Sequence, residues 1–281
     1  MTSSVRKAIS GAFAVFCTAS VLLALVPLGF ILFFVVRQGV QSINLAFFTH
    51  LPLPVGEAGG GMANAIVGTL LVSGLAAAMA VPIGVLSGIY MAEYAGSRFA
   101  ASVRFAADTL NGVPSIVIGL FAYVVAVLPF KQFSAAAGGF ALGVMMIPII
   151  ARTTEELLLL VPPTMREGAL ALGATRARAV FTVVVPAALP GIVTGVVLAL
   201  ARIAGETAPL LFTAFNNRFF STSLRQPIST LTVQVFTYAT GPYEDWHRQA
   251  WAGALVLVAM VLTCSLLARL ATRRLERMHA R

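Results

Sequence analysis

The residues best placed to do chemistry lie in one apolar run, "LALARIAGETAPLLF", residues 198–212. It contains a single arginine, Arg202, and a single glutamate, Glu206, which share one face of a helix because they are four positions apart. Such a run is typical of a membrane span, where each ionised side chain costs about 2.5–3.5 kcal/mol on insertion scales. The guanidinium fork of arginine suits the oxygens of an oxyanion. The pair therefore indicates a gate or an anion contact, and the alternative is a structural ion pair that fixes this helix to a neighbour.

The neighbours of the pair strengthen the functional interpretation. Pro209 has no N–H to donate to the carbonyl of Gly205, so the helix is expected to bend beside the two charges, with Gly205 and Pro209 as the hinge. The span is expected to run from about 187 to 215, which places Arg202 near the middle of the membrane. On one continuous helix, Arg202 and Glu206 are expected to neutralise each other.

The composition places the whole chain in lipid. Of its 281 residues, 59% are hydrophobic and 10% are charged, and the mean hydropathy is +0.92. The net charge of +9 does not indicate nucleic acid, because the basic residues lie between apolar runs rather than on one stripe. Cys17 and Cys264 each lie inside an apolar run, and the three histidines are scattered. We therefore predict no catalytic residue and no metal site.

Apolar runs of spanning length predict an all-α integral membrane protein with six transmembrane helices. The bias of Lys and Arg predicts a multi-pass membrane protein with both termini in the cytoplasm. The expected organisation is an N-terminal helix and outer segment at 1–62, a transmembrane domain at 63–271, and a basic tail at 272–281 that is attracted to anionic membrane lipid. The predicted spans are 12–36, 64–91, 108–130, 137–160, 187–215 and 249–270.

Other charged residues near the spans have simpler interpretations. Arg152, Glu155 and Glu156 are expected to form a solvated helix end. Asp108 and Asn111 are expected to open the third span, since acidic residues favour a helix N-terminus.

The connector "LVPPTMREGALALGATRARAVFTVVVPAALPG", residues 160–191, is predicted to fold back into a short cytoplasmic helix. Prolines at 162 and 163 end the preceding helix, and Thr164 lies three residues before Glu167, the spacing of a capping box. The new helix is expected to end near Gly173. The small residues Gly168 and Ala169 allow another surface to approach closely.

The spacing Glu167-Gly168-Ala169, Gly173 and Val183-x-Val185-Pro186 resembles the EAA loop of ABC importer permeases, with Gly168 in place of an alanine. The resemblance implies that Glu167, Gly168, Ala169 and Gly173 couple the chain to a separate ATPase. In agreement, the chain has no G-x-x-x-x-G-K-[ST] motif. No cofactor is expected in this chain, and ATP and Mg are expected on the partner ATPase.

The stretch "RIAGETAPLLFTAF" is similar to the R-x-x-G-E-T signature of phosphate importer permeases, and 110–121 and 226–255 resemble the PstA type. This resemblance implies a type I (MetI-like) core in the bacterial cytoplasmic (inner) membrane, with Arg202, Glu206 and Thr207 on the path of inorganic phosphate. It also implies three partners: a PstC-type permease, an ATPase homodimer and a periplasmic or lipid-anchored phosphate-binding protein.

The sequence is also compatible with functions other than phosphate import. A permease for sulfate or molybdate and a phosphate-sensing membrane scaffold both remain open. An intramembrane enzyme acting on lipid phosphates is disfavoured, because the sequence brings together no nucleophile, acid and base.

Overall fold

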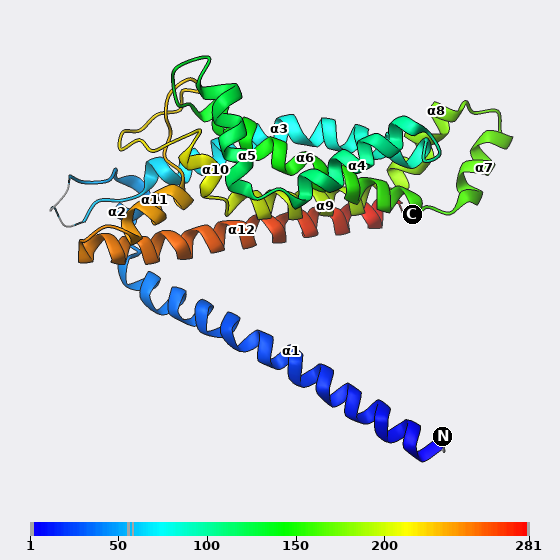
Figure 1. The fold of residues 1–281 in the computed structure, drawn as a ribbon, viewed down its shortest axis with the longest axis horizontal. Helices are drawn as coiled ribbons and strands as arrows, with labels where there is room; N and C mark the ends of the chain where they lie inside the picture. Colours follow the sequence, from blue (N-terminus) through cyan, green and yellow to red (C-terminus); the bar gives the residue numbers. More distant parts are fainter. Residues whose placement is uncertain (1–2, 55–56, 58, 280–281) are drawn as a thin grey trace.

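The computed structural model describes residues 3–54, 57 and 59–279, and every regular element in these ranges is helical (Figure 1). The side chains of the basic tail 272–281 lie outside the part that is described. The elements are α1 (Ser3–Gly39), η1 (Val40–Ser42), α2 (Leu45–Thr49), α3 (Ala63–Glu93), α4 (Arg98–Gly112), α5 (Ser115–Ala122), η2 (Tyr123–Val127), α6 (Ala135–Leu159), α7 (Pro163–Ala171), α8 (Arg176–Ala179), η3 (Val180–Val184), α9 (Val185–Ala204), α10 (Ala208–Leu211), α11 (Leu231–Ala239) and α12 (Glu244–His279).

The prediction of an all-α membrane protein is confirmed. Within the described residues, five helices are long and apolar enough to cross a membrane, and a sixth span forms if a bent pair of helices counts as one. The bent pair, Arg98–Gly112 with Ser115–Val127, turns by 107° where the sequence predicted one span at 108–130. Pro114, which cannot continue the first helix, lies at this turn and caps α5. Asp108 and Asn111 therefore lie near the end of α4 and do not open a helix, contrary to the prediction.

The centre of the bundle is the contact between α3 and α6. Cβ atoms built on Gly84 and Gly88 of α3 would meet the Ile150 side chain at 2.8 Å and the Ala151 carbonyl oxygen at 2.6 Å. In lipid, helices associate mainly through close packing, which small residues permit because they let two backbones approach. The bundle core continues from this contact through buried residues of α9 and α10, among them Ala199 and Leu210.

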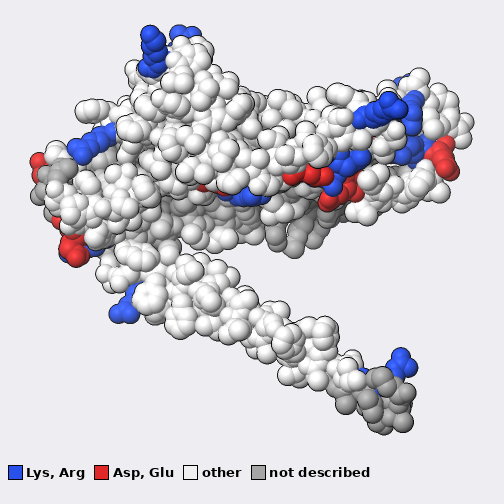
Figure 2. Space-filling model, in the orientation of Figure 1, with Lys and Arg blue, Asp and Glu red and all other residues white. Residues whose placement is uncertain are grey.

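The two ends of the bundle contain different helices. In Figure 1, α7, α8 and the end of α12 lie at the right, whereas α2, α11 and the start of α12 lie at the left. The face shown in Figure 2 carries charged side chains at both ends, and the surface between them is uncharged apart from a short row of red and blue groups. This distribution is expected when the middle of a protein contacts hydrocarbon.

The first helix, α1, leaves the bundle (Figure 1). It touches the bundle near its C-terminal end, where a Cβ on Gly39 would meet Leu255 Cβ at 2.8 Å. Its large apolar side chains from Ile9 to Phe34 are exposed. The helix therefore adds little to the core of its own chain.

Two glycines of α3 allow a direct test of this packing. Gly68 is buried against the backbone of Ser229, and a Cβ at this position would overlap the Ser229 carbonyl oxygen, whereas a Cβ on Gly74 would meet nothing within 4 Å. We expect Gly68→Ala to lower the free energy of unfolding by about 1–3 kcal/mol, the usual cost of overpacking. Gly74→Ala is the matched control and should be neutral or stabilising by up to about 1 kcal/mol. Thermal unfolding of the purified protein, followed by tryptophan fluorescence, measures both; equal effects would contradict the packing argument.

Candidate functional site

The charged pair lies at a break between two helices. α9 ends at Ala204, and the N–H of Gly205 donates to the Arg202 carbonyl at 3.3 Å. α10 begins at Ala208, with Pro209 in its first turn. The sequence predicted one helix over 187–215 with a bend at Pro209, and the structure instead has two helices. Glycine weakens the helix at 205, and proline is tolerated only in a first turn, so the chain ends one helix and starts another.

The break separates the two charges. Arg202 is exposed in the last turn of α9, and Glu206 is half-buried beyond it. Among the described residues, neither makes an ion pair, so the expected neutralisation along one helix face is wrong. Thr207, also half-buried, accepts the backbone N–H bonds of Leu210 and Leu211 through its carbonyl, at 3.1 and 3.2 Å. Arg202, Glu206 and Thr207 thus stand together at a helix break as separate polar groups.

Buried threonine hydroxyls on and beside α11 form hydrogen bonds at the break and at the start of α11. The Thr232 hydroxyl donates to the Glu206 carbonyl at 3.0 Å and lies 3.3 Å from the Thr230 hydroxyl. The N–H of Leu231, the first residue of α11, donates to the Thr69 hydroxyl of α3 at 2.8 Å. These threonines are at most 5% exposed. Sequence reasoning missed them, although the polar run "STLTVQ" at 229–234 was an available signal.

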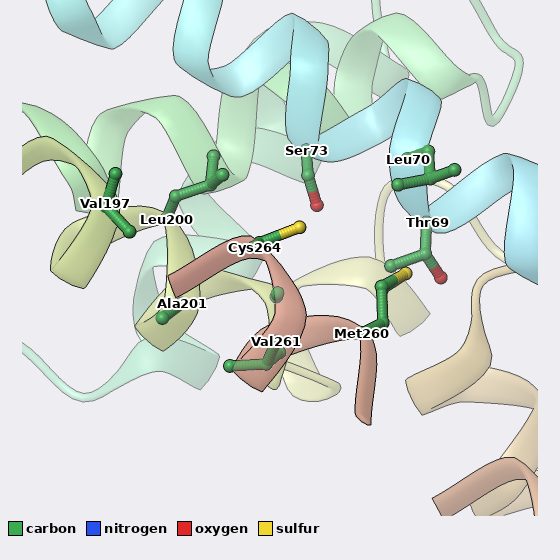
Figure 3. A pocket seen from close by; sticks show the side chains of 10 residues that line it. Thr69, Leu70, Ser73, Val197, Leu200, Ala201, Met260, Val261 and Cys264 are labelled. Atoms are coloured by element: carbon green, nitrogen blue, oxygen red, sulfur yellow. The ribbon is translucent and has the colours of Figure 1, made fainter. Parts of the chain in front are cut away.

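An apolar niche lies next to the break, between α3, α9 and α12 (Figure 3). Its volume is about 40 Å³, and its lining includes Ala201, Ala204 and Cys264. The lining offers almost no polar surface, so the niche is not a site for an anion. Its remaining lining residues are Thr69, Leu70, Ser73, Val197, Leu200, Met260 and Val261.

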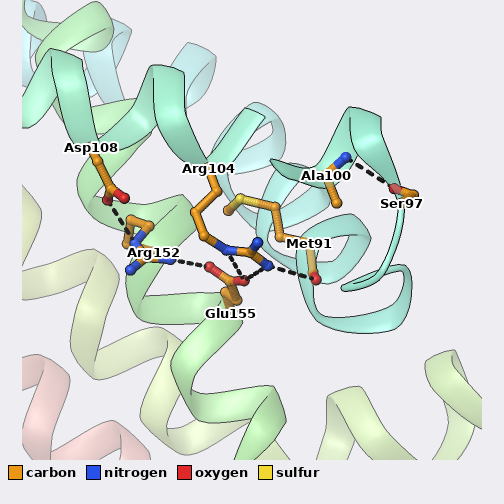
Figure 4. A network of polar contacts seen from close by, with 7 residues as sticks. All are labelled: Met91, Ser97, Ala100, Arg104, Asp108, Arg152 and Glu155. Atoms are coloured by element: carbon orange, nitrogen blue, oxygen red, sulfur yellow. Dashed lines mark hydrogen bonds and ion pairs between the residues drawn. The ribbon is translucent and has the colours of Figure 1, made fainter. Parts of the chain in front are cut away.

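A second group of charges joins α4 to α6 (Figure 4). Glu155 Oε1 accepts from Arg104 at 2.5 and 2.9 Å, and Glu155 Oε2 lies 2.5 Å from Arg152 Nη1. Arg152 Nε lies 3.0 Å from Asp108 Oδ1. The Glu155 side chain is 2% exposed, so the expected solvated helix end is wrong at this residue. The signal was the complementary spacing of Arg104 and Asp108, four apart, and Arg152 and Glu155, three apart, on two helices.

The group balances two arginines with two carboxylates. Removal of the Glu155 charge would leave Arg104 and Arg152, each 29% exposed, on either side of a buried neutral side chain. We expect Glu155→Gln to lower the free energy of unfolding by about 3 kcal/mol, because one partner of a buried ion pair is lost. Asp245→Asn on α12 is the control, since its pair with Arg248 is exposed and 3.9 Å long, and should cost less than about 1 kcal/mol. Thermal unfolding compares them, and a Glu155→Gln protein as stable as the control would contradict the assigned role.

The connector forms the short helix α7, as expected. Gly173 has φ +85°, and the N–H of Ala174 donates to the Ala169 carbonyl at 3.1 Å, which is the glycine-terminated helix end that the sequence predicted. The predicted capping box is wrong, because Pro162 precedes the helix and no side chain caps it. Glu167 and Gly168 are exposed, Ala169 is half-buried, and no residue of α7 is buried. The helix therefore presents its surface outwards at one end of the bundle (Figure 1).

The sequence of the bundle matches one known family of membrane proteins. The family model described as "Binding-protein-dependent transport system inner membrane component" matches residues 84–279, which is more than half of the chain. The chain belongs to this family. It is therefore a multi-pass membrane component of a transport system.

Relatives and solved structures agree with the family. The chain is 45% identical to the phosphate transport system permease protein PstA of Yersinia pestis, over 89% of this chain and 85% of that protein. It is 36% identical, over 92% of its length and 87% of the relative, to PstA 1 of Mycobacterium tuberculosis. The inward-facing MetNI methionine ABC transporter has the same fold, with a TM-score of 0.62 at 20% identity over 76% of this chain and 94% of that one. The expected MetI-like core is thus confirmed.

Proposed function

We propose that this family member is the PstA-type permease subunit of an ATP-driven phosphate importer, with Arg202, Glu206 and Thr207 on the anion path. The observation that carries the proposal is the position of the R-x-x-G-E-T run. It falls at the break between α9 and α10, in a chain whose relatives are named phosphate permeases. Gly205 and Pro209, which produce the break, act as its hinge.

The chemistry of the three residues suits a partly protonated oxyanion. The planar guanidinium of Arg202 can bind two oxygens at once. The Glu206 carboxylate accepts a hydrogen bond from the proton that hydrogen phosphate still carries near neutral pH, and it repels the fully ionised sulfate. The Thr207 hydroxyl both donates and accepts, so it serves either kind of phosphate oxygen. Separate charges favour this role, since an internal ion pair would have to break before the anion could bind.

The ATPase is proposed to dock on α7. Glu167, Gly168 and Ala169 lie on an exposed helix whose small residues allow close approach, and Gly173 ends the helix with a positive φ. ATP and Mg would be held by the ATPase homodimer, and the chain would contribute the docking surface and the path.

The second permease is proposed to cover α1. The 37-residue α1 stands apart from the bundle with its apolar side chains exposed (Figure 1). A PstC-type permease or lipid can cover such a surface, and the shared path of a two-permease importer favours the permease.

The orientation follows from α7. The ATPase is cytoplasmic, so the end of the bundle that carries α7 and the end of α12 would face the cytoplasm. The opposite end, with α2 and α11, would face the phosphate-binding protein.

Uptake into proteoliposomes tests the proposal. The chain is reconstituted with a PstC-type permease, the ATPase and the binding protein, and uptake of labelled phosphate is measured with ATP inside. We expect ATP-dependent phosphate uptake that excess sulfate or molybdate does not inhibit. Preferential uptake of sulfate or molybdate would replace phosphate by that anion, and assembly without any uptake would favour a sensing scaffold.

A further inference from the structure

Helix α7 is held to the bundle by one ion pair among the described residues. Nη2 of Arg166, on α7, lies 2.5 Å from Oε1 of Glu93, the last residue of α3. The Glu93 side chain is only 4% exposed, and that of Arg166 is 31% exposed. Because no residue of α7 is buried, apolar packing does little to fix this helix. The pair is thus the ion pair that joins α7 to α3, and α7 also lies against η3 and α8.

This ion pair is only half formed. Glu93 Oε2 and Arg166 Nε are both buried, and neither has a hydrogen-bond partner in the described structure. These two atoms are the ones that would form the second bond of a bidentate arginine–carboxylate pair. Buried polar atoms without partners cost stability, so their presence needs an explanation other than stability. A small movement of α7 relative to α3 would bring them together.

We propose that Glu93 and Arg166 form a coupling latch, which is monodentate in the state described here and bidentate when α7 is pushed towards α3. The proposal rests on the proposed function, in which an ATPase moves α7. The two arrangements differ by one buried charge-assisted hydrogen bond, so they are discrete states that a docked partner can favour differently. Glu93 and Arg166 are accordingly positioning residues, since they act through α7 and α3 and not on the transported anion.

Helix α3 connects the latch to the break. It is 31 residues long and packs closely on α6 through Gly84 and Gly88. Near its other end, the Thr69 hydroxyl accepts the N–H of Leu231 in α11, and the neighbouring Thr232 holds the Glu206 carbonyl. A displacement of α3 at Glu93 would therefore also shift Glu206, which is proposed to contact the anion. An ion pair that only fixed α7 to α3 would not require such a connection.

The amount of anion imported per ATP hydrolysed distinguishes a coupling latch from an ion pair that only stabilises the structure. In the reconstituted complex, we expect Glu93→Gln to retain the bound ATPase and its ATP hydrolysis, while the amount of anion imported per ATP falls at least tenfold. The charge-swapped double variant, Glu93→Arg with Arg166→Glu, should recover part of this loss, because the pair can form again. Asp245→Asn, which removes an exposed carboxylate of an ion pair at the other end, is the control and should keep the wild-type ratio.

Two results of the transport assay would overturn the latch. One is an unchanged ratio of uptake to hydrolysis in Glu93→Gln; the other is parallel loss of ATPase binding and uptake in the well-folded Glu93→Asp variant. The wild-type complex reports separately on the proposed function. If it imports an anion other than phosphate, the ratio is measured with that anion.

A distance measurement tests the latch without transport. Spin labels are placed at Ala171→Cys on α7 and Gly74→Cys on α3, in a protein whose Cys17 and Cys264 are replaced by serine. With the ATPase bound, we expect the distance between the labels to change on addition of ATP, and the change to be lost in Glu93→Gln. A change of equal size in both proteins would contradict the latch.

Discussion

Replacement of Arg202 by glutamine is expected to lower phosphate uptake by about 100-fold or more while the complex still assembles. Removal of one oxyanion-hole donor from an enzyme costs a factor of about 100–1,000 in rate, and we expect a similar factor for an arginine that binds the transported anion. Arg202 is exposed and makes no ion pair among the described residues, so its removal strands no buried carboxylate of this chain. Uptake into proteoliposomes and co-purification of the subunits measure the two parts of the prediction.

Two further variants show which property of Arg202 matters. Arg202→Lys keeps the charge but loses the planar fork, so uptake should fall by an intermediate factor. Arg248→Gln, which removes an exposed arginine at the outer end of α12, should leave uptake near the wild-type rate. Unimpaired uptake by Arg202→Gln would show that the residue is structural and that the anion path lies elsewhere.

Reversal of the charge at Glu167 is expected to detach or uncouple the ATPase. Glu167 is exposed on a helix without buried residues, so the substitution leaves the core of the chain unchanged. A cationic side chain at a site that fits a carboxylate adds repulsion and also removes the favourable contact. We expect ATP-driven uptake to fall below about a tenth of the wild-type rate, because like charges at an interface cost several kcal/mol. ATPase recovery on the purified chain and uptake measure the effect.

The matched control is Glu244→Arg, the same charge reversal at an exposed residue in the first turn of α12, at the opposite end of the bundle. It should leave ATPase binding unchanged. Normal ATP-driven uptake by Glu167→Arg would refute the docking role of α7. Detachment by Glu167→Arg also differs from the latch result, in which the ATPase stays bound.

The sequence was informative where the structure depends on neighbours along the chain. The long apolar helices, the fold-back of the connector and its end at Gly173 all follow from local rules of hydropathy and helix termination. The break at Gly205 was misplaced by a few residues, because hydropathy remains high through 204–212 and only glycine and proline mark the interruption. The sharp turn before α5 was hidden for the same reason.

Contacts between distant segments could not be predicted in this way. Glu155 resembles a solvated residue until α4 brings Arg104 against it, 51 positions away. Glu93 and Arg166 are 73 positions apart, and nothing local distinguishes them from residues at the membrane surface. Thr232 and Glu206 belong to different segments that meet only when α11 packs against α3 and α12. Each of these contacts depends on the arrangement of the whole bundle.

The separation of α1 from the bundle affects the stability of an unassembled copy of the chain. In water, so much uncovered apolar surface would cause aggregation, but acyl chains solvate it as well as a protein neighbour does. An unassembled copy can therefore persist in the bilayer, and the proposed pairing with a second permease would rely on shape fit and on the concentration of that subunit. Excess detergent should dissociate the proposed pair by dilution long before either subunit unfolds.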